Sequence, residues 1–85
     1  NKDVPIAILV DSLYKIDNAI KLAKEINAVA LNPNNKFITN QIVKKIQSNN
    51  IKVYPYTINT PMNIKRMKSM GVDAIITDFP ERINK

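Results

Sequence analysis

The residues of this 85-residue chain that could do chemistry stand directly after short apolar runs. They are Asp11-Ser12, Asn32-Pro33-Asn34-Asn35, Thr57-Ile58-Asn59-Thr60 and Thr77-Asp78-Phe79-Pro80. Asp11 and Asp78 could together hold a divalent cation, because such ions prefer oxygen ligands. We favour the alternative, in which Asp11 caps a helix and Asp78 fixes its own loop by local hydrogen bonds. Two single carboxylates far apart in a sequence are a common coincidence.

Two residue types with versatile chemistry are absent, since the chain has neither histidine nor cysteine. Without histidine it lacks the commonest general acid–base group and the commonest metal ligand. Without cysteine it cannot form disulfides or thiolate metal sites. Its single glycine, Gly71, stands where a helix should end, so there is no glycine-rich phosphate-binding loop. The sequence therefore predicts no catalytic residue and no bound metal in this segment.

The formal net charge of +6 raises the alternative of nucleic-acid binding. The basic residues are spread over three predicted helices, mostly opposite the apolar stripes, and no aromatic residues interleave with them. We therefore expect a solvated surface and no nucleic-acid partner. No apolar run approaches the roughly 18 residues of a membrane helix, so we expect a soluble protein without a membrane span, either cytoplasmic or secreted. The basic residues in question are Lys15, Lys21, Lys24, Lys44, Lys45, Lys65, Arg66 and Lys68.

Four runs of strand length precede the polar clusters, and two of them show little alternation. Near-continuous apolar runs are typical of parallel strands buried on both faces. Pro55 lies inside the third run and cannot donate to a sheet, which indicates a bulge or an irregular end there. The two tyrosines around it, Tyr54 and Tyr56, face the same side of the strand. One should fill space in the core, and a ring at the strand end could instead pack on the carbon skeleton of a ligand. The runs are Val4–Val10, Asn27–Leu31, Lys52–Ile58 and Val72–Ile76.

Helical patterns separate these runs. Apolar residues at steps of three or four predict three amphipathic helices. Asp11 or Ser12 should cap the first helix, Thr39 the second and Thr60 the third, with Asn49-Asn50 ending the second and Gly71 the third. The expected buried stripes are Leu13, Ile16, Ile20, Ala23 and Ile26; then Ile38, Ile42, Val43 and Ile46; then Ile64, Met67 and Met70.

The order is β-α-β-α-β-α-β, which predicts parallel strands joined by right-handed helical crossovers. Two architectures fit this order: an open doubly wound sheet, or part of a (β/α)₈ barrel. A complete barrel has about 250 residues, so this chain would hold half of one. In both architectures functional groups gather at the carboxyl ends of the strands, where the polar clusters stand.

The last third of the chain resembles the glycerophosphodiester phosphodiesterases. In that family a strand of the form V-x-x-W-T-V-N is followed by a short helix and then by G-V-D-x-I-x-T-D-x-P. Here the same frame reads VYPYTIN, from Val53 to Asn59, and then GVDAIITDFP, from Gly71 to Pro80. Tyr56 replaces the family's usual tryptophan. The first two strand–helix units are similar to the fifth and sixth units of the family's barrel.

The resemblance implies an α/β fold, with residues 1–85 forming a partial domain of four β/α units, the fifth to the eighth of the barrel. It implies a hydrolase of lipid and glycerol metabolism that converts glycerophosphodiesters to glycerol 3-phosphate and an alcohol. The family uses a divalent cation, Mg²⁺ or Ca²⁺ here, and a pair of histidines, all held on the first four units. This chain resembles only the last four, so it should be inactive alone. Tyr56 and Asn59 are the residues we expect to contact the substrate.

The expected partners are the substrate and whatever completes the barrel. Four strands in an arc leave two unpaired edges, and unpaired edges attract other strands. We therefore expect the chain to pair with the missing amino-terminal half or with a second copy of itself. The alternative to an enzyme fragment is a non-catalytic half-barrel that acts as a folding or assembly unit.

Overall fold

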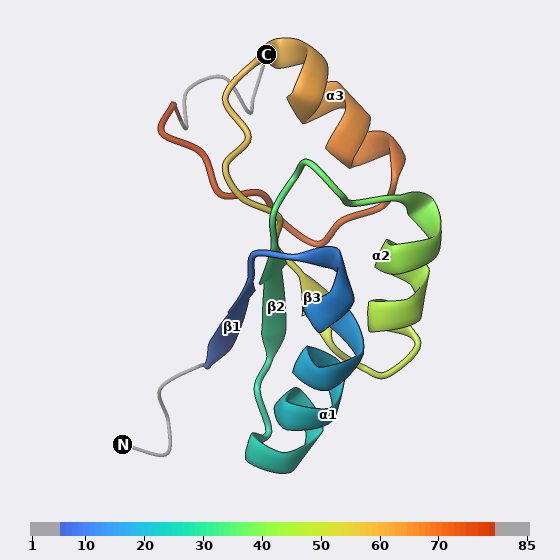
Figure 1. Cartoon of the computed structure of the whole chain (residues 1–85). Helices are drawn as coiled ribbons and strands as arrows, with labels where there is room; N and C mark the ends of the chain where they lie inside the picture. The colour runs from blue at the N-terminus through green and yellow to red at the C-terminus, as the bar shows by residue number, and fades with distance from the viewer. Residues whose placement is uncertain (1–5, 80–85) are drawn as a thin grey trace.

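The computed structural model describes residues 6–79, and within them three parallel strands form a sheet in the order β1-β2-β3. Helices α1 and α2 pack against this sheet, and α3 lies above the carboxyl ends of the strands (Figure 1). The parallel arrangement is the one that the alternation of strand and helix predicts. The elements are β1 (Ala7–Val10), the 3₁₀ helix η1 (Leu13–Lys15), α1 (Ile16–Ile26), β2 (Ala30–Pro33), α2 (Asn40–Gln47), β3 (Lys52–Val53) and α3 (Pro61–Ser69).

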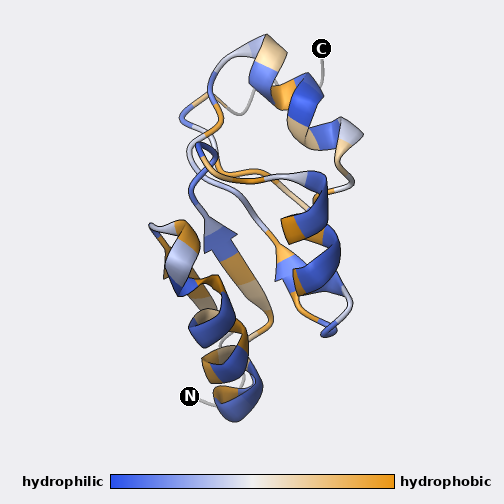
Figure 2. Ribbon diagram, turned by 45° about the vertical axis from the view of Figure 1, so that its right-hand side comes forward, coloured by the Kyte–Doolittle hydropathy of each residue, from blue (hydrophilic) through white to orange (hydrophobic). Residues whose placement is uncertain are grey.

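The two faces of the sheet differ in what covers them. Val10, Leu31 and Val53 are at most 1% exposed and belong to the core cluster that the helices complete. Because side chains alternate along a strand, the residues between them point to the opposite, helix-free face. Leu9, on that face, is 62% exposed. In Figure 2 hydrophobic and hydrophilic residues alternate along α1 and α2, as helices with one buried side require.

The first helix departs from its expected stripe and cap. Ile16, Ile20 and Ala23 are buried as predicted. Leu13 is 56% and Ile26 42% exposed, so the prediction that both ends of the stripe are buried was wrong. Neither predicted cap bond forms at this start. Ser12 precedes η1 without a side-chain cap bond, and the carboxylate of Asp11 pairs instead with Lys15 at 3.0 Å.

The caps of the other two helices are confirmed. The Thr39 hydroxyl accepts a hydrogen bond from the Ile42 N–H, and the Thr60 hydroxyl accepts one from the Asn63 N–H, both at 3.2 Å. Pro61 occupies the first turn of α3, where its missing N–H costs nothing. Gly71 follows α3 with φ of 77°, the left-handed conformation expected of a glycine at that position.

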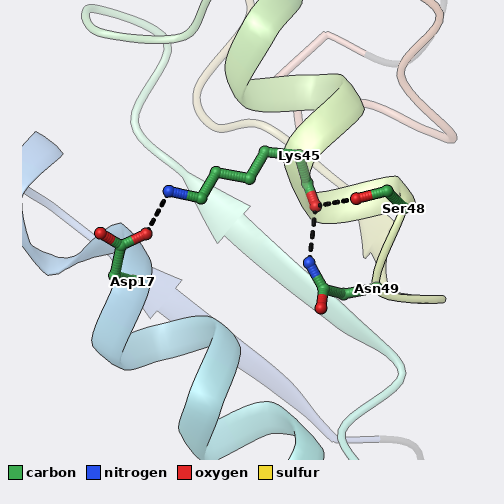
Figure 3. Close-up of polar contacts among 4 residues, drawn as sticks. All are labelled: Asp17, Lys45, Ser48 and Asn49. Atoms are coloured by element: carbon green, nitrogen blue, oxygen red, sulfur yellow. Dashed lines mark hydrogen bonds and ion pairs between the residues drawn. The ribbon is translucent and has the colours of Figure 1, made fainter.

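The end of α2 is tied to its own last turn and to α1. The Lys45 carbonyl accepts hydrogen bonds from Ser48 Oγ and Asn49 Nδ2, each at 2.8 Å (Figure 3). The same lysine reaches across to the carboxylate of Asp17 on α1. These contacts align the two helices that cover the sheet. Asn50, just beyond, is left-handed with φ of 62°, as the predicted helix end requires.

Strand boundaries are shorter than expected. The second strand runs over Ala30–Pro33 instead of Asn27–Leu31, because Asn27 closes α1 in a left-handed conformation. The third run keeps only Lys52–Val53 as regular strand, followed by an isolated bridge between Asn34 and Tyr56. The expected start of the first strand, Val4 and Pro5, lies outside the described residues.

The fourth run, residues 72–76, was predicted to be a strand and does not form a regular one. It still lies beside the third run, since the N–H groups of Asp73 and Ile76 donate to the carbonyls of Val53 and Pro55 at 3.0 and 2.9 Å. Pairing in the other direction is interrupted at Pro55, which has no N–H to donate, and resumes at Ile58, whose N–H donates to the Ile76 carbonyl at 2.8 Å. The Val53 N–H donates to the Asp73 carboxylate at 2.8 Å instead of to a backbone carbonyl. The fourth unit is therefore attached by an interrupted backbone ladder and a side chain.

Candidate functional site

A row of polar and aromatic side chains lies on the helix-free face at the carboxyl ends of the strands. Asn32 pairs in register with Leu9 of β1, and the Tyr54 N–H donates to the Leu31 carbonyl at 2.9 Å, which places Tyr54 on the other side of Asn32. Two residues further along, Asn34 and Tyr56 form a parallel bridge. Both tyrosines thus share one face, as their spacing predicts.

Tyr56 is held mainly through its backbone. Its N–H donates to the Pro33 carbonyl at 3.0 Å, and its carbonyl accepts from both the backbone N–H and the side-chain amide of Asn35, at 2.8 and 3.2 Å. The same Asn35 amide donates to the Thr57 carbonyl at 3.1 Å. The peptide bond between Tyr56 and Thr57 is cis. The ring, half-buried at the end of the third run, is positioned by a loop that follows β2.

Asn59 ties the loop after the third run to the segment after the fourth. Its Oδ1 accepts hydrogen bonds from the Thr77 hydroxyl at 3.1 Å and from the Asp78 N–H at 2.9 Å. Its Nδ2 donates to the Asp78 carboxylate at 3.1 Å. Thr77 Oγ1 also accepts from the Phe79 N–H at 3.0 Å. Asn59 therefore shapes the rim of the site, and its contact with substrate stays a prediction.

The two strand-end carboxylates have separate partners. Asp78 is bound by Asn59, and Asp11 by Lys15. The hydrogen bond from Lys15, together with its positive charge, lowers the pKa of Asp11, and the same contact raises the pKa of Lys15. Within residues 6–79 no group of three or more acidic side chains lies close enough to hold a metal ion. These residues do not fit a cation site.

The contacts of three residues were not predicted from the sequence, although Asn32 and Asn35 belong to a polar cluster that was. Asn35 clamps the third run, Asp73 replaces a strand carbonyl, and Asn32 places its Oδ1 in a buried position with no hydrogen-bond partner among the described residues. The signal for Asn32 and Asn35 was present, because asparagines directly after an apolar run are candidates for either loop or ligand contacts. Asp73 stood inside an apolar run, where a charge requires a specific partner.

Parallel strands with α1 and α2 on one face of the sheet match part of a (β/α)₈ barrel, since a doubly wound sheet carries helices on both faces. The model of the glycerophosphoryl diester phosphodiesterase family matches residues 1–82, and the chain belongs to that family. The expected family and partial-barrel fold are thereby confirmed. No helix within residues 6–79 has the length and hydropathy needed to cross a membrane.

Two relatives show how much of such a protein the chain represents. It is 39% identical over 74 residues to the uncharacterized protein YqiK of Bacillus subtilis, covering 85% of this chain and 29% of that protein. It is 38% identical over 64 residues to a glycerophosphodiester phosphodiesterase of Bacillus altitudinis, covering 73% of this chain and 26% of that protein. The chain thus spans less than a third of the relatives it matches.

Solved structures share the fold. A phosphodiesterase of Oleispira antarctica, in complex with the product sn-glycerol-3-phosphate, superposes with a TM-score of 0.84 at 21% identity, covering 96% of this chain and 32% of that one. A glycerophosphodiester phosphodiesterase of Parabacteroides distasonis superposes with a TM-score of 0.74 at 24% identity, covering 96% of this chain and 33% of that one. At these identities the likeness concerns the fold alone.

Proposed function

We propose that this chain is the carboxyl-terminal part of a glycerophosphodiester phosphodiesterase, which hydrolyses glycerophosphodiesters to glycerol 3-phosphate and an alcohol. The observation that carries the proposal is the family match over residues 1–82, nearly the whole chain. The product bound to the Oleispira antarctica phosphodiesterase, sn-glycerol-3-phosphate, supports the substrate class.

In this proposal the chain supplies barrel wall and part of the substrate pocket. Hydrolysis of a phosphodiester uses a base at the attacking hydroxyl group and an acid at the leaving oxygen. The chain has no histidine for either role, so both belong to the rest of the barrel. Tyr56 and Asn59 are the proposed substrate contacts, the first through its ring and the second through the rim that it shapes.

A divalent cation, Mg²⁺ or Ca²⁺, belongs to the same proposal, but not to this segment. Asp11 and Asp78 are already bound by Lys15 and Asn59, and no third carboxylate joins them in the described part of the chain. We therefore assign the cation to residues elsewhere in the complete enzyme. The contribution of this chain is limited to positioning the substrate beside it.

The test compares the chain alone with the same chain inside a complete barrel. Glycerophosphocholine is supplied with Mg²⁺ or with Ca²⁺, and release of glycerol 3-phosphate is measured. We expect release from the complete barrel and none from the purified chain. Release by the chain above a mock preparation would overturn the assignment of catalysis to the other half. A complete barrel that releases nothing would overturn the proposed reaction.

A non-catalytic assembly unit is the second candidate, and the open side of β1 favours it. A groove of about 420 Å³ runs between β1 and α1. Leu9 and Tyr14, which line it, are 62% and 80% exposed, and the Lys15 ammonium lies 5.9 Å from the centre of the Tyr14 ring. Neighbouring exposed side chains of this size are typical of interaction surfaces. The groove is lined by Ile8, Leu9, Val10, Tyr14, Lys15, Asn18, Ala19 and Leu22.

The partner we propose for this side is the amino-terminal half of the barrel or a second copy of the chain. Sedimentation equilibrium at micromolar concentration tests whether the chain associates. Self-association, or a stoichiometric complex with a separately produced amino-terminal half, supports the assembly unit. A single species of monomer mass with a sharp, cooperative melt would contradict it. Activity in the reconstituted pair would show that assembly serves catalysis.

A further inference from the structure

The charged side chains, expected above to form a solvated surface, are distributed unevenly over the chain. From residue 6 to residue 25 three acidic and three basic side chains balance one another, whereas from residue 26 to residue 72 seven basic residues occur and no acidic one. The positive charge is therefore concentrated in the part that forms α2, β3 and α3. The seven basic residues are Lys36, Lys44, Lys45, Lys52, Lys65, Arg66 and Lys68.

Four of these cations and one apolar side chain make up what we name the basic face. The Lys45 ammonium does not belong to it, because it pairs with the Asp17 carboxylate on α1 (Figure 3). Within residues 6–79 no ion pair joins the lysines of the basic face, and all its members are exposed. The basic face consists of Lys36, Lys44, Met62, Lys65 and Arg66.

The basic face extends over two helices that lie side by side (Figure 1). Before the start of α2, the Ile38 carbonyl accepts a hydrogen bond from Arg66 Nη2 of α3 at 3.0 Å. At the end of α2, Gln47 Nε2 donates to the carbonyl of Gly71, just after α3, at 2.8 Å. Lys44 precedes Gln47 by three residues and therefore lies on the same side of α2, the side toward α3.

On α3 an apolar side chain stands among the cations. Ile64 and Met67 are at most 4% exposed and attach the helix to the core, while Met62 is 81% exposed. Lys65 and Arg66 follow Met62 by three and four residues, so they are its neighbours on the helix surface. The Met62 side chain thus extends into solvent between positive charges.

We propose that the basic face docks reversibly on the surface of an anionic lipid bilayer. Its cations would contact the headgroup phosphates, and the Met62 side chain would enter the boundary between headgroups and acyl chains. A nucleic acid fits this surface less well, because binding of bases uses aromatic rings for stacking and neither α2 nor α3 carries one. The inference goes beyond the proposed reaction and does not depend on it.

Completion of the barrel leaves the basic face open. Helix α2 already has a neighbour on each side, since Lys45 contacts Asp17 of α1 and Arg66 of α3 contacts Ile38. In the proposed assembly the missing half joins beside β1 and beyond the segment at residues 72–76. Neither junction lies between α2 and α3, so a complete barrel can present this face to a membrane.

Vesicle co-sedimentation of a complete barrel containing this chain tests the proposal. The vesicles consist of phosphatidylcholine alone or of phosphatidylcholine with phosphatidylglycerol, at about 0.1 M and about 1 M salt, between which the Debye length falls from about 10 to about 3 Å. We expect binding to the anionic vesicles at the lower salt concentration, and its loss at the higher one or without phosphatidylglycerol. Equal binding to both kinds of vesicle, or no binding, would overturn the proposal.

Two double variants separate the basic face from net charge. Lys44→Gln with Lys65→Gln removes two cations of the face, and Lys21→Gln with Lys24→Gln removes two exposed cations from α1. We expect the first pair to weaken partition onto anionic vesicles about ten- to thirtyfold and the second by less than about threefold. Equal losses would mean that net charge alone drives binding, and would overturn the face. Both variants should melt like the parent, which shows that they fold.

Met62→Ser and a short DNA duplex separate a membrane from other polyanions. Met62→Ser removes the apolar tip without changing charge, and we expect it to weaken vesicle binding about fivefold. Unchanged vesicle binding in this variant would overturn the membrane as the partner. Tighter binding to the duplex than to the anionic vesicles, reduced by the Lys44 and Lys65 changes, would also overturn it in favour of a nucleic acid.

Discussion

Within the described residues, the backbone of β1 pairs only toward β2, and exposed apolar side chains line much of the groove next to it. Beside β3, the segment at residues 72–76 is held by backbone hydrogen bonds to the third run and by the Asp73 carboxylate, which accepts from the buried Val53 N–H at 2.8 Å. Asn59 secures the continuation of that segment. The β1 side of the sheet thus exposes apolar surface in the described part of the chain, while the β3 side is secured by backbone and side-chain hydrogen bonds.

The difference teaches how a barrel can be divided. Apolar surface is non-directional, so an edge that relies on it can accept any complementary partner. Hydrogen bonds from side chains are directional and specify one arrangement. In the proposed assembly, the β3 side would be fixed beforehand, and the β1 side would receive the partner.

Removing the Asp73 carboxylate should destabilise the attachment of residues 72–76 to β3. Asp73→Ala leaves the Val53 N–H buried without an acceptor, and we expect a loss of about 2 kcal/mol in the free energy of unfolding, measured by denaturant titration. Asp73→Asn retains an acceptor oxygen and should lose less. Equal stability of Asp73→Ala and the parent would mean that this carboxylate does not hold the fourth segment.

Gly71→Val should disturb the turn that leads into the same segment. A Cβ at this position meets nothing within 4 Å, so the cost arises from φ of 77° and not from a clash. We expect a loss of about 1–2 kcal/mol in thermal melts, because a β-branched residue is disfavoured in the left-handed region. Lys65→Ala, an exposed change on α3, should stay within about 0.5 kcal/mol. A Gly71→Val variant as stable as the parent would contradict the left-handed turn at Gly71.

A charge on the open side should change assembly and not stability. Leu9→Lys places an ammonium on a side chain that is already 62% exposed, so we expect unfolding free energy within about 0.5 kcal/mol of the parent. Association in sedimentation equilibrium should weaken, because the groove would then have to bury a second ammonium besides that of Lys15, without a carboxylate partner of its own. Ile26→Lys, at an apolar residue 42% exposed but outside the groove, is the control and should associate like the parent.

The smallest effect concerns the ion pair next to this open side. The hydrogen bond from Lys15 and its positive charge lower the pKa of Asp11, so the carboxylate should titrate below the usual range of an aspartate in an NMR titration, and Lys15→Gln should raise its pKa again. A lowered folded pKa means that the contribution to stability is present above the unfolded pKa and is lost as pH falls through the folded one. Both side chains are about half exposed, so the pair should contribute little to stability, and the midpoint of unfolding of Lys15→Gln should barely differ from that of the parent. An unchanged Asp11 titration in Lys15→Gln would refute the pairing.

Features set by neighbouring residues could be predicted from the sequence. The caps at Thr39 and Thr60 and the turn at Gly71 depend on residues within one helical turn, and all three are confirmed. The irregular third strand also follows from Pro55 alone. The sequence could not show that the fourth run fails to form a regular strand. Its pairing depends on Pro55 and on the Asp73 carboxylate, which accepts from an N–H 20 residues earlier in the chain.

The candidate site likewise combines features that the sequence predicts with features that depend on residues far apart in the chain. Its location at the carboxyl ends of the strands follows from the order of the elements, and Tyr56 and Asn59 do lie there. The hydrogen bonds of Asn59 to residues 77 and 78 required the folded chain, since they join loops 18 and 19 residues apart. The isolation of Asn32 Oδ1 was equally invisible, because the sequence does not reveal which polar groups lack a partner.

Gln47, the last residue of α2, has a consequence for how the molecule opens. Its Nε2 donates to the Gly71 carbonyl at 2.8 Å and to the Asp73 carboxylate at 3.2 Å, and that carboxylate also holds the Val53 amide. The end of α2, β3 and the turn at residues 71–73 are thereby joined in one cooperative unit. Their amide protons should exchange with solvent in a single concerted opening. The amide protons of β1 should exchange at rates independent of that opening.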